Sequence, residues 1–140
     1  MPTTNNSNGF SLIELLIVLS IIGILSAFCI PIYTQHIVHE KRIEAEMTLS
    51  KLAVAMENYY TVHNSYEDAS LEALGFNEKI ASGRYLLNIV YATDNEFALE
   101  AAPQGAQAEK DVRCATLSLN SKGDKNISGS GPLSDCWQIS

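Results

Sequence analysis

The first forty residues contain almost no charge. All nine lysines and arginines lie at or after Lys41, and Glu14 is the only acidic residue before Glu40. An ordinary secretory signal places basic residues ahead of its apolar core, so the lack of any cation here argues against such a signal. A lipoprotein signal is also disfavoured, because Phe28, which is not small, precedes Cys29.

Several kinds of functional site are missing as well. There is no phosphate-cradling glycine loop and no recognisable nucleophile–base set, so we expect no catalytic residues and no enzyme activity. His36 and His39 are three apart and His63 follows later, but no Asp, Glu or Cys completes a ligand set. The sequence therefore predicts neither a metal site nor a cofactor.

The overall charge limits binding to nucleic acid. At a net charge of −7, the chain cannot hold a phosphate backbone through bulk attraction and would need a local basic patch. Lys122 and Lys125 are the best candidates for such a patch, and they give it thin support.

One long apolar run is present, from Phe10 to Ile32, with Glu14 as its single charge. As a helix these 23 residues rise about 1.5 Å each, or roughly 35 Å, enough to cross a bilayer's hydrocarbon layer. A carboxylate inside such a span needs a cationic partner. Cleavage after Gly9 would create one, because the new amino terminus on Phe10 could meet the Glu14 of an axially shifted neighbour.

At these residues the chain resembles the type IV pilin family and its class III signal. The matching features are a short polar leader, a glycine before the cut, a phenylalanine after it, a glutamate four positions on and an apolar run: Gly9, Phe10, Glu14 and residues 15–32. The resemblance implies that a prepilin peptidase cleaves between Gly9 and Phe10 and methylates the Phe10 amine. It also implies that Glu14 aids subunit docking and that Gly23 and Pro31 mark helix bends.

The helical pattern continues beyond the apolar run. Small and apolar residues recur at spacings of three and four, which indicates one face of a helix: Ala45, Leu49, Leu52, Met56 and Tyr59. We predict a single helix from about Phe10 to about Val62, kinked near Pro31, with an amphipathic half over 33–62. Glu44, Glu46 and their charged neighbours are expected on the other face, either solvated or bridging to stacked subunits.

The remainder predicts a small antiparallel sheet. Residues 63–84 are polar, resemble the family's αβ-loop and allow a helical turn over Ser70–Leu74. Residues 85–93 and 96–102 are rich in aromatic and β-branched side chains and predict a hairpin. The segment 103–111 is expected to be a loop. Residues 112–120 predict a third strand, and 125–128 a short fourth one.

The three cysteines differ in context. Cys29 lies in the apolar run and is expected to behave as a small buried hydrophobe. Cys114 and Cys136 fall in the exported part, where two cysteines pair by default, and they match the pair that bounds the pilin D-region. Asn126 begins a glycosylation-type tripeptide, which we interpret as a turn.

The predicted fold class is therefore α+β: a long N-terminal helix, membrane-spanning in its first half, packed on an antiparallel sheet of three or four strands with a C-terminal disulfide region. The expected parts are a cleaved leader (1–9), an assembly half of the helix (10–32), its amphipathic half (33–62) and a head (63–140), itself made of the αβ-loop (63–84), the sheet (85–129) and the disulfide region (114–136).

The resemblance implies a structural pilus subunit supporting adhesion, twitching motility or DNA uptake. Its expected partners are other pilin subunits, prepilin peptidase, the inner-membrane assembly machinery and membrane lipid, with DNA weakly supported. The expected location is the bacterial inner membrane, with the head in the periplasm, and then the surface pilus. Two alternatives stay open: a type II secretion pseudopilin, and a minor pilin that acts as a DNA-uptake receptor.

Overall fold

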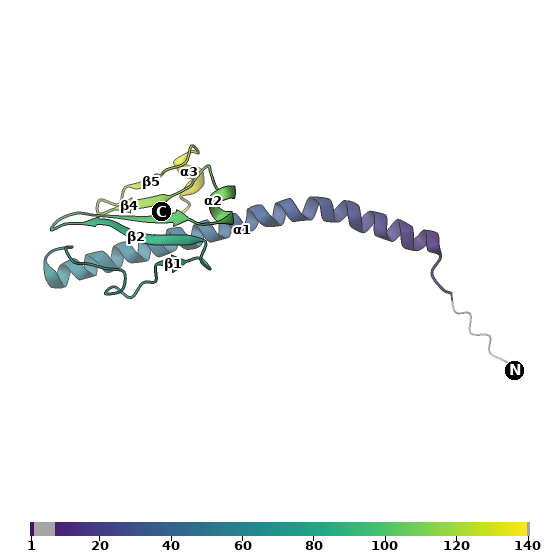
Figure 1. Ribbon diagram of the computed structural model, residues 1–140, viewed down its shortest axis with the longest axis horizontal. Helices are drawn as coiled ribbons and strands as arrows, with labels where there is room; N and C mark the ends of the chain where they lie inside the picture. Colours follow the sequence, from purple (N-terminus) through teal and green to yellow (C-terminus); the bar gives the residue numbers. More distant parts are fainter. Residues whose placement is uncertain (2–7, 140) are drawn as a thin grey trace. The chain divides into compact units, whose positions relative to one another are not determined.

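The computed structural model describes residue 1 and residues 8–139 (Figure 1). The main element is helix α1, Leu12–His63, whose 52 residues confirm the predicted long helix. The chain divides into two compact units, one up to His36 and the other from Ile37 onward. Most of the predicted leader, residues 2–7, lies outside the described residues.

The first unit is helical from Leu12 and apolar around its whole circumference. Among the described residues, α1 is the one helix long and apolar enough to cross a membrane, and its most apolar 18-residue stretch has none of its residues buried. Leu12 is 79% exposed and Phe28 is 67% exposed. Such a surface is unfavourable in water and requires lipid or other helices around it.

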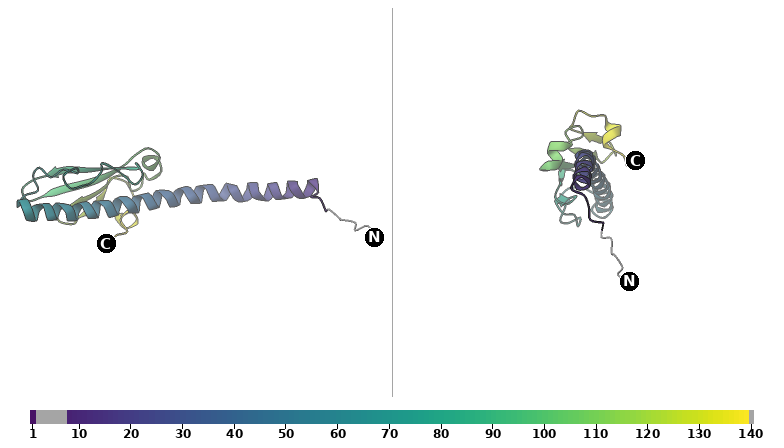
Figure 2. Two further views of the ribbon diagram at one scale, coloured as in Figure 1. Left: turned by 90° about the horizontal axis from the view of Figure 1, so that it is seen from below. Right: turned by 90° about the vertical axis from the view of Figure 1, so that its right-hand side faces the viewer.

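In the second unit, α1 is amphipathic and packs under the sheet, as Figures 1 and 2 show. The predicted stripe is confirmed at four positions that are fully buried: Ala45, Leu49, Leu52 and Met56. Two charged residues, Arg42 and Glu46, are also buried, at 8% and 0% exposure. The expectation that the charged run near residue 44 faces solvent is therefore wrong for these two.

The sheet is antiparallel and has five strands in the order β1-β2-β3-β4-β5. The strands are β1 (Lys79–Ile80), β2 (Tyr85–Ala92), β3 (Phe97–Pro103), β4 (Leu117–Asn120) and β5 (Lys125–Ile127). The predicted hairpin corresponds to β2 and β3. The additional strand, β1, lies in the segment expected to be loop, and Ala81 and Ser82 adopt positive φ values of 52° and 58° in the turn that leads into β2.

The third predicted strand begins later than expected. Residues 112–116 form a turn and a connection instead of a strand, and Ala115 has a φ of 53°, a conformation that does not continue a strand. Two short helices also occur in segments without a helical prediction: α2 (Ala106–Lys110) and α3 (Leu133–Cys136). The predicted turn at Ser70 is present, since the Leu74 amide donates to the Ser70 carbonyl at 3.0 Å.

The core lies between the amphipathic face of α1 and the inner face of the sheet. Strands alternate buried and less buried positions, as a one-sided sheet requires. Tyr85, Phe97, Leu99 and Leu117 supply the sheet's side of this core. Tyr66 closes one end, where its ring meets that of Phe97 edge-on at 4.9 Å between centroids.

Candidate functional site

The predicted cleavage point lies in exposed, non-helical backbone. Residues 8–11 precede α1, which begins at Leu12, and the first amide-to-carbonyl bond runs from Leu15 to Ser11 at 3.1 Å. Apart from its two chain neighbours, no described residue has an atom within 4 Å of a Cβ built on Gly9, and Phe10 is 84% exposed. A protease can approach such a peptide bond without unfolding anything. Cleavage and methylation at Phe10 remain predictions.

Glu14 occupies the first turn of α1, where the helix macrodipole favours a carboxylate. Gly23 and Pro31 both lie inside the helix, and proline removes one backbone hydrogen bond there. Hydroxyls along the apolar half are satisfied internally: Ser20 Oγ donates to the Leu16 carbonyl at 2.8 Å and Ser26 Oγ to the Ile22 carbonyl at 2.7 Å. Bending at Gly23 and Pro31 stays a prediction, as does docking through Glu14. Cys29 is exposed in the chain by itself.

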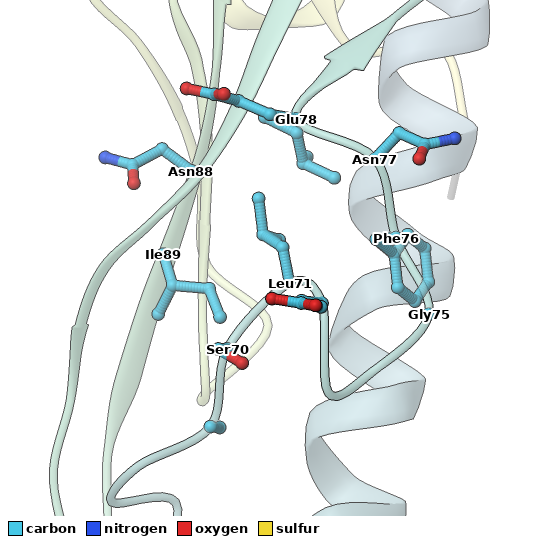
Figure 3. A pocket seen from close by; sticks show the side chains of 11 residues that line it. Ser70, Leu71, Gly75, Phe76, Asn77, Glu78, Asn88 and Ile89 are labelled. Atoms are coloured by element: carbon cyan, nitrogen blue, oxygen red, sulfur yellow. The ribbon is translucent and has the colours of Figure 1, made fainter.

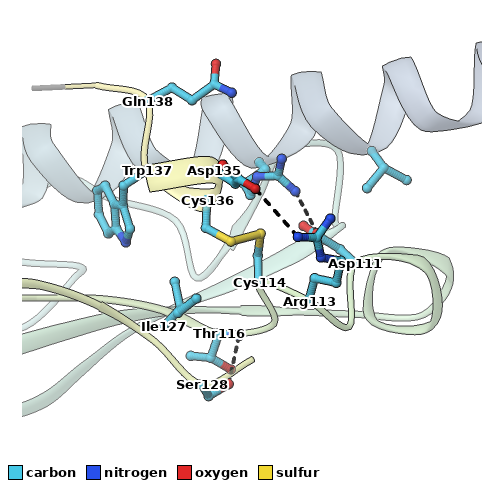
Figure 4. The surroundings of a disulfide bond; sticks show 12 residues. Asp111, Arg113, Cys114, Thr116, Ile127, Ser128, Asp135, Cys136, Trp137 and Gln138 are labelled. Carbon is cyan, nitrogen blue, oxygen red and sulfur yellow. Dashed lines mark hydrogen bonds and ion pairs between the residues drawn. A yellow bond between two sulfur atoms is a disulfide. The ribbon is translucent and has the colours of Figure 1, made fainter. Parts of the chain in front are cut away.

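The C-terminal region is joined to the body by the predicted disulfide. Cys114 and Cys136 are bonded, with their Cα atoms 5.4 Å apart (Figure 4). Both cysteines are buried, at 3% and 0% exposure. The bond links the turn before β4 to the short helix α3 and so confirms the pairing expected from the sequence.

Two glycines fit the segment after β5 against this turn. The Gly129 amide donates to the Cys114 carbonyl at 3.1 Å, and the Gly131 amide donates to the Arg113 carbonyl at 2.7 Å. A Cβ on Gly129 would lie 2.1 Å from the Arg113 carbonyl oxygen, far inside van der Waals contact. Only glycine therefore permits this close approach of two backbones, and the approach fixes the backbone of Arg113.

A buried polar cluster ties α2 to α1. Arg42 Nη1 donates to Asp111 Oδ1 at 2.6 Å, while the Tyr85 hydroxyl and Gln107 Nε2 donate to Asp111 Oδ2 at 3.2 and 3.3 Å. Gln107 Nε2 also lies 2.9 Å from the Val38 carbonyl. Burial, followed by the charge of Asp111, raises the pKa of the Tyr85 phenol well above its ordinary value, so Tyr85 remains a donor.

The C-terminal tail is fixed by a second buried charge. Glu46 Oε2 accepts the backbone amides of Gln138 and Ile139 at 3.0 and 3.2 Å. The Lys125 ammonium donates to the Ile139 carbonyl and lies 5.3 Å from the centroid of the Trp137 ring. Lys125 therefore has a structural role in holding the tail, which weakens its candidacy as a DNA contact.

The other cations are more available. Lys122, in the turn before β5, has a side chain 70% exposed and forms only a 3.4 Å pair with Glu96. Arg113 is 69% exposed and lies 3.5 Å from Asp135. Lys110, at the end of α2, is exposed and makes no ion pair within the described part of the chain. Lys110 and Arg113 were not predicted as candidate DNA contacts, although both lie within two residues of Asp111 in the sequence.

A groove lies between the 69–78 segment and β2 (Figure 3). It has a volume of about 750 Å³, and Leu71 and Ile89 supply its apolar part. Glu72 and Glu78 also line it, and none of its lining residues is basic. The groove therefore does not suit a polyanion. In the described residues, no group of three His, Cys, Asp or Glu side chains is placed to hold a metal ion.

A helix with an apolar N-terminal half, packed under an antiparallel sheet with a C-terminal disulfide, is the pilin fold. The crystal structure of the Neisseria meningitidis non-core minor pilin PilV superposes with a TM-score of 0.52 at 20% identity, over 73% of this chain and 98% of that one. That likeness concerns the fold.

Sequence comparison then gives the family. Residues 4–30 match the prokaryotic N-terminal methylation motif, and residues 31–118 match the family model described as type IV minor pilin ComP, DNA uptake sequence receptor. The second match covers more than half of the chain. The chain therefore belongs to the type IV pilin family, whose members are structural, non-enzymatic proteins.

Similar curated proteins are pilins and fimbrial proteins. The type IV major alpha-pilin of Moraxella bovis is 31% identical over 77% of this chain and 75% of its own length. Fimbrial protein EcpB of Eikenella corrodens is 33% identical over 79% and 77%. The Myxococcus xanthus type IV major pilin protein PilA is 39% identical over 50% of this chain, but the match spans only 31% of that protein.

Proposed function

We propose that this chain is a minor pilin that binds DNA at the surface of a type IV pilus during DNA uptake. The observation that carries the proposal is the match of residues 31–118 to the model of a DNA uptake sequence receptor. A DNA-uptake receptor is therefore preferred to a general structural subunit as the function of this chain.

The arrangement of charge supports the proposal. The chain has a net charge of −7, so DNA contact must come from a local group of cations. Arg113 and Lys122 have exposed side chains with long, weak ion pairs of 3.5 and 3.4 Å. Arg113 and the exposed Lys110 form one group before β4, whereas Lys122 is a separate cation after β4. Pairs of this kind exchange readily for phosphate oxygens, because exposed ion pairs contribute only about 0–1 kcal/mol.

Fluorescence anisotropy with a labelled duplex and the full chain in detergent micelles tests DNA binding. We expect saturable binding whose logarithmic affinity falls with the logarithm of salt concentration at a slope of roughly −2 to −3, as expected for two or three phosphate contacts. A duplex of scrambled sequence tests sequence preference. No saturable binding at low salt would refute the receptor function.

Filament incorporation is the second part of the proposal, and the pilin relatives favour it. The precursor is inserted in the inner membrane with its head in the periplasm, processed between Gly9 and Phe10, methylated on Phe10 and polymerised with other subunits. Mass spectrometry of sheared filaments tests this. A scarce chain that begins at methylated Phe10 supports a minor subunit, whereas processed chain confined to the membrane supports the pseudopilin alternative.

Glu14 is the residue proposed to guide docking, because a carboxylate in the apolar half of α1 needs a cation and the Phe10 amine of a neighbour supplies one. Glu14→Ala should leave the precursor in the membrane at its normal level and reduce its amount in filaments at least tenfold. Glu40→Ala, which removes an acid at the far side of the apolar run, is the control. Normal incorporation of Glu14→Ala would show that the charge pair is not needed.

A further inference from the structure

A small cavity beside the disulfide is lined by three cations from separate parts of the second unit. Its volume is about 130 Å³, and its basic lining residues are Arg42 of α1, Lys110 of α2 and Arg113 of the turn before β4. Cys114, Cys136, Asp111 and Asp135 complete the lining. Figure 4 shows this neighbourhood, with Arg113 directed toward Asp135 and the disulfide close by.

The burial of these residues defines an inner wall and a rim. The Arg42 side chain is 10% exposed and Asp111 is 5% exposed, whereas the Arg113 and Asp135 side chains are 69% and 59% exposed. Lys110 is exposed too. Arg42 and the disulfide therefore form the inside of the cavity, and Lys110, Arg113 and Asp135 lie where a ligand from solvent arrives.

The two acids in the lining differ in what they can still accept. Both oxygens of Asp111 are occupied, Oδ1 by Arg42 and Oδ2 by the Tyr85 hydroxyl and Gln107. Asp135 holds Arg113 only across 3.5 Å in an exposed pair. An incoming anion therefore has to displace Asp135 alone, and the buried ion pair behind it stays intact.

Arg42, one of the lining residues, has hydrogen-bonding capacity that the chain does not use. Arg42 Nε is buried without a hydrogen-bond partner, although a buried polar group is normally satisfied. The guanidinium is already oriented by Asp111, so its other N–H groups are held in place without further loss of side-chain freedom. Arginine donors fixed in this way suit the oxygens of a phosphate group.

We propose that this cavity receives one phosphate group of bound DNA, held by Lys110 and Arg113 at the rim and by Arg42 at the inner wall. A cavity needs only about 10–15 Å³ of such volume to hold one water molecule, so about 130 Å³ leaves room for a phosphate group. The site fixes the position of the DNA backbone and reads no sequence. This inference rests on the proposed DNA-receptor function.

Backbone packing makes the site specific to the disulfide-bonded state. The Arg113 carbonyl accepts a hydrogen bond from the Gly131 amide. Cys114, the residue after Arg113, is bonded to Cys136 of α3. Reduction of the disulfide releases that anchor, and the rim loses its fixed geometry. Binding of phosphate should therefore weaken when the bond is removed, even where the fold survives.

The test titrates inorganic phosphate into the full chain in micelles without DNA, and phosphorus NMR detects its binding. We expect saturable binding to the unmodified chain and at least tenfold weaker binding to the double variant Lys110→Gln/Arg113→Gln. Lys79→Gln serves as the matched control, because Lys79 is an exposed lysine on β1, at the opposite edge of the sheet, and should bind phosphate normally. All three chains should unfold at similar urea concentrations, since the substituted side chains are exposed.

The same chains are then titrated with duplex DNA. We expect Lys110→Gln/Arg113→Gln to bind DNA five- to fiftyfold more weakly, with a salt slope smaller by about 2, and Lys79→Gln to match the unmodified chain. Phosphate binding with unchanged DNA affinity in the double variant would overturn the proposal, because the ligand would then be another phosphate compound. DNA binding with no saturable phosphate site would also overturn it and leave the receptor function standing. Failure of every chain to bind DNA would refute the receptor function itself.

Discussion

The buried pair of Arg42 and Asp111 gives the sharpest prediction about stability. Their side chains are 10% and 5% exposed and meet at 2.6 Å. Asp111→Asn keeps the shape of the side chain but removes its charge, leaving the Arg42 guanidinium buried without a counter-ion. Loss of one partner of a buried pair costs about 3–5 kcal/mol, so we expect the free energy of unfolding to fall by about 3 kcal/mol.

Arg42→Met completes a double-mutant cycle. Alone it leaves the Asp111 carboxylate buried with only the Tyr85 and Gln107 donors, and we expect a similar loss of about 3 kcal/mol. The double variant removes both charges at once, so it should be about as stable as either single variant. Its loss of stability should be far smaller than the sum of the two single losses. Arg113→Gln, which breaks an exposed pair, is the control and should change stability by less than about 1 kcal/mol.

Urea unfolding of the full chain in micelles provides the measurement. Trp137 is the single tryptophan of the sequence and is 7% exposed in the core, so its fluorescence reports unfolding of the second unit alone. Exposed ion pairs contribute about 0–1 kcal/mol. If each single variant lost less than about 1 kcal/mol and the two losses were additive, the argument that this cluster joins α2 to α1 would be refuted.

Three further predictions concern the second unit. Cys136→Ser opens a bond across 22 residues and should lower its stability by about 3 kcal/mol, which urea unfolding measures; an unchanged midpoint would show that the bond contributes nothing. Gly129→Ala places a Cβ 2.1 Å from the Arg113 carbonyl oxygen and should cost about 2 kcal/mol or more, while a neutral effect would contradict the close backbone packing. Burial, then the hydrogen bond and charge of Glu57, raises the pKa of Tyr66 from 10.0 to about 12. Because the folded chain holds this proton more tightly, its stabilising effect is complete below pH 10 and is lost between about 10 and 12; Tyr66→Phe should flatten that part of the pH profile, and an unchanged profile would refute the assignment.

The fold was largely predictable because its elements are periodic. Spacings of three and four gave the amphipathic face of α1, and aromatic and β-branched runs gave β2 and β3. The short elements β1 and α2 were not predictable, because two to five residues carry too little periodic signal. They depend on turns with positive φ, such as the one at Ala81, and on contacts formed only in the folded chain.

The candidate site was less predictable for a related reason. Arg42 and Glu46 continue the buried face of α1 at a spacing of four, but their charge alone assigned them to solvent. Their partners are distant in sequence: Asp111 is 69 residues from Arg42, and Gln138 is 92 residues from Glu46. Pattern analysis of one segment cannot find a counter-ion supplied by another. Gly9, Phe10 and Glu14, by contrast, form a local motif, so their roles could be proposed from one segment alone, and those roles remain predictions.

The most direct test of the receptor function is uptake of labelled duplex DNA by cells that lack this chain, with surface filaments counted in the same cells. The account predicts that filaments persist at near-normal number and that DNA uptake falls by at least tenfold, with recovery when the chain is restored. Normal DNA uptake in cells without the chain would contradict the receptor function, and loss of the filaments themselves would show that the chain is needed to build the filament.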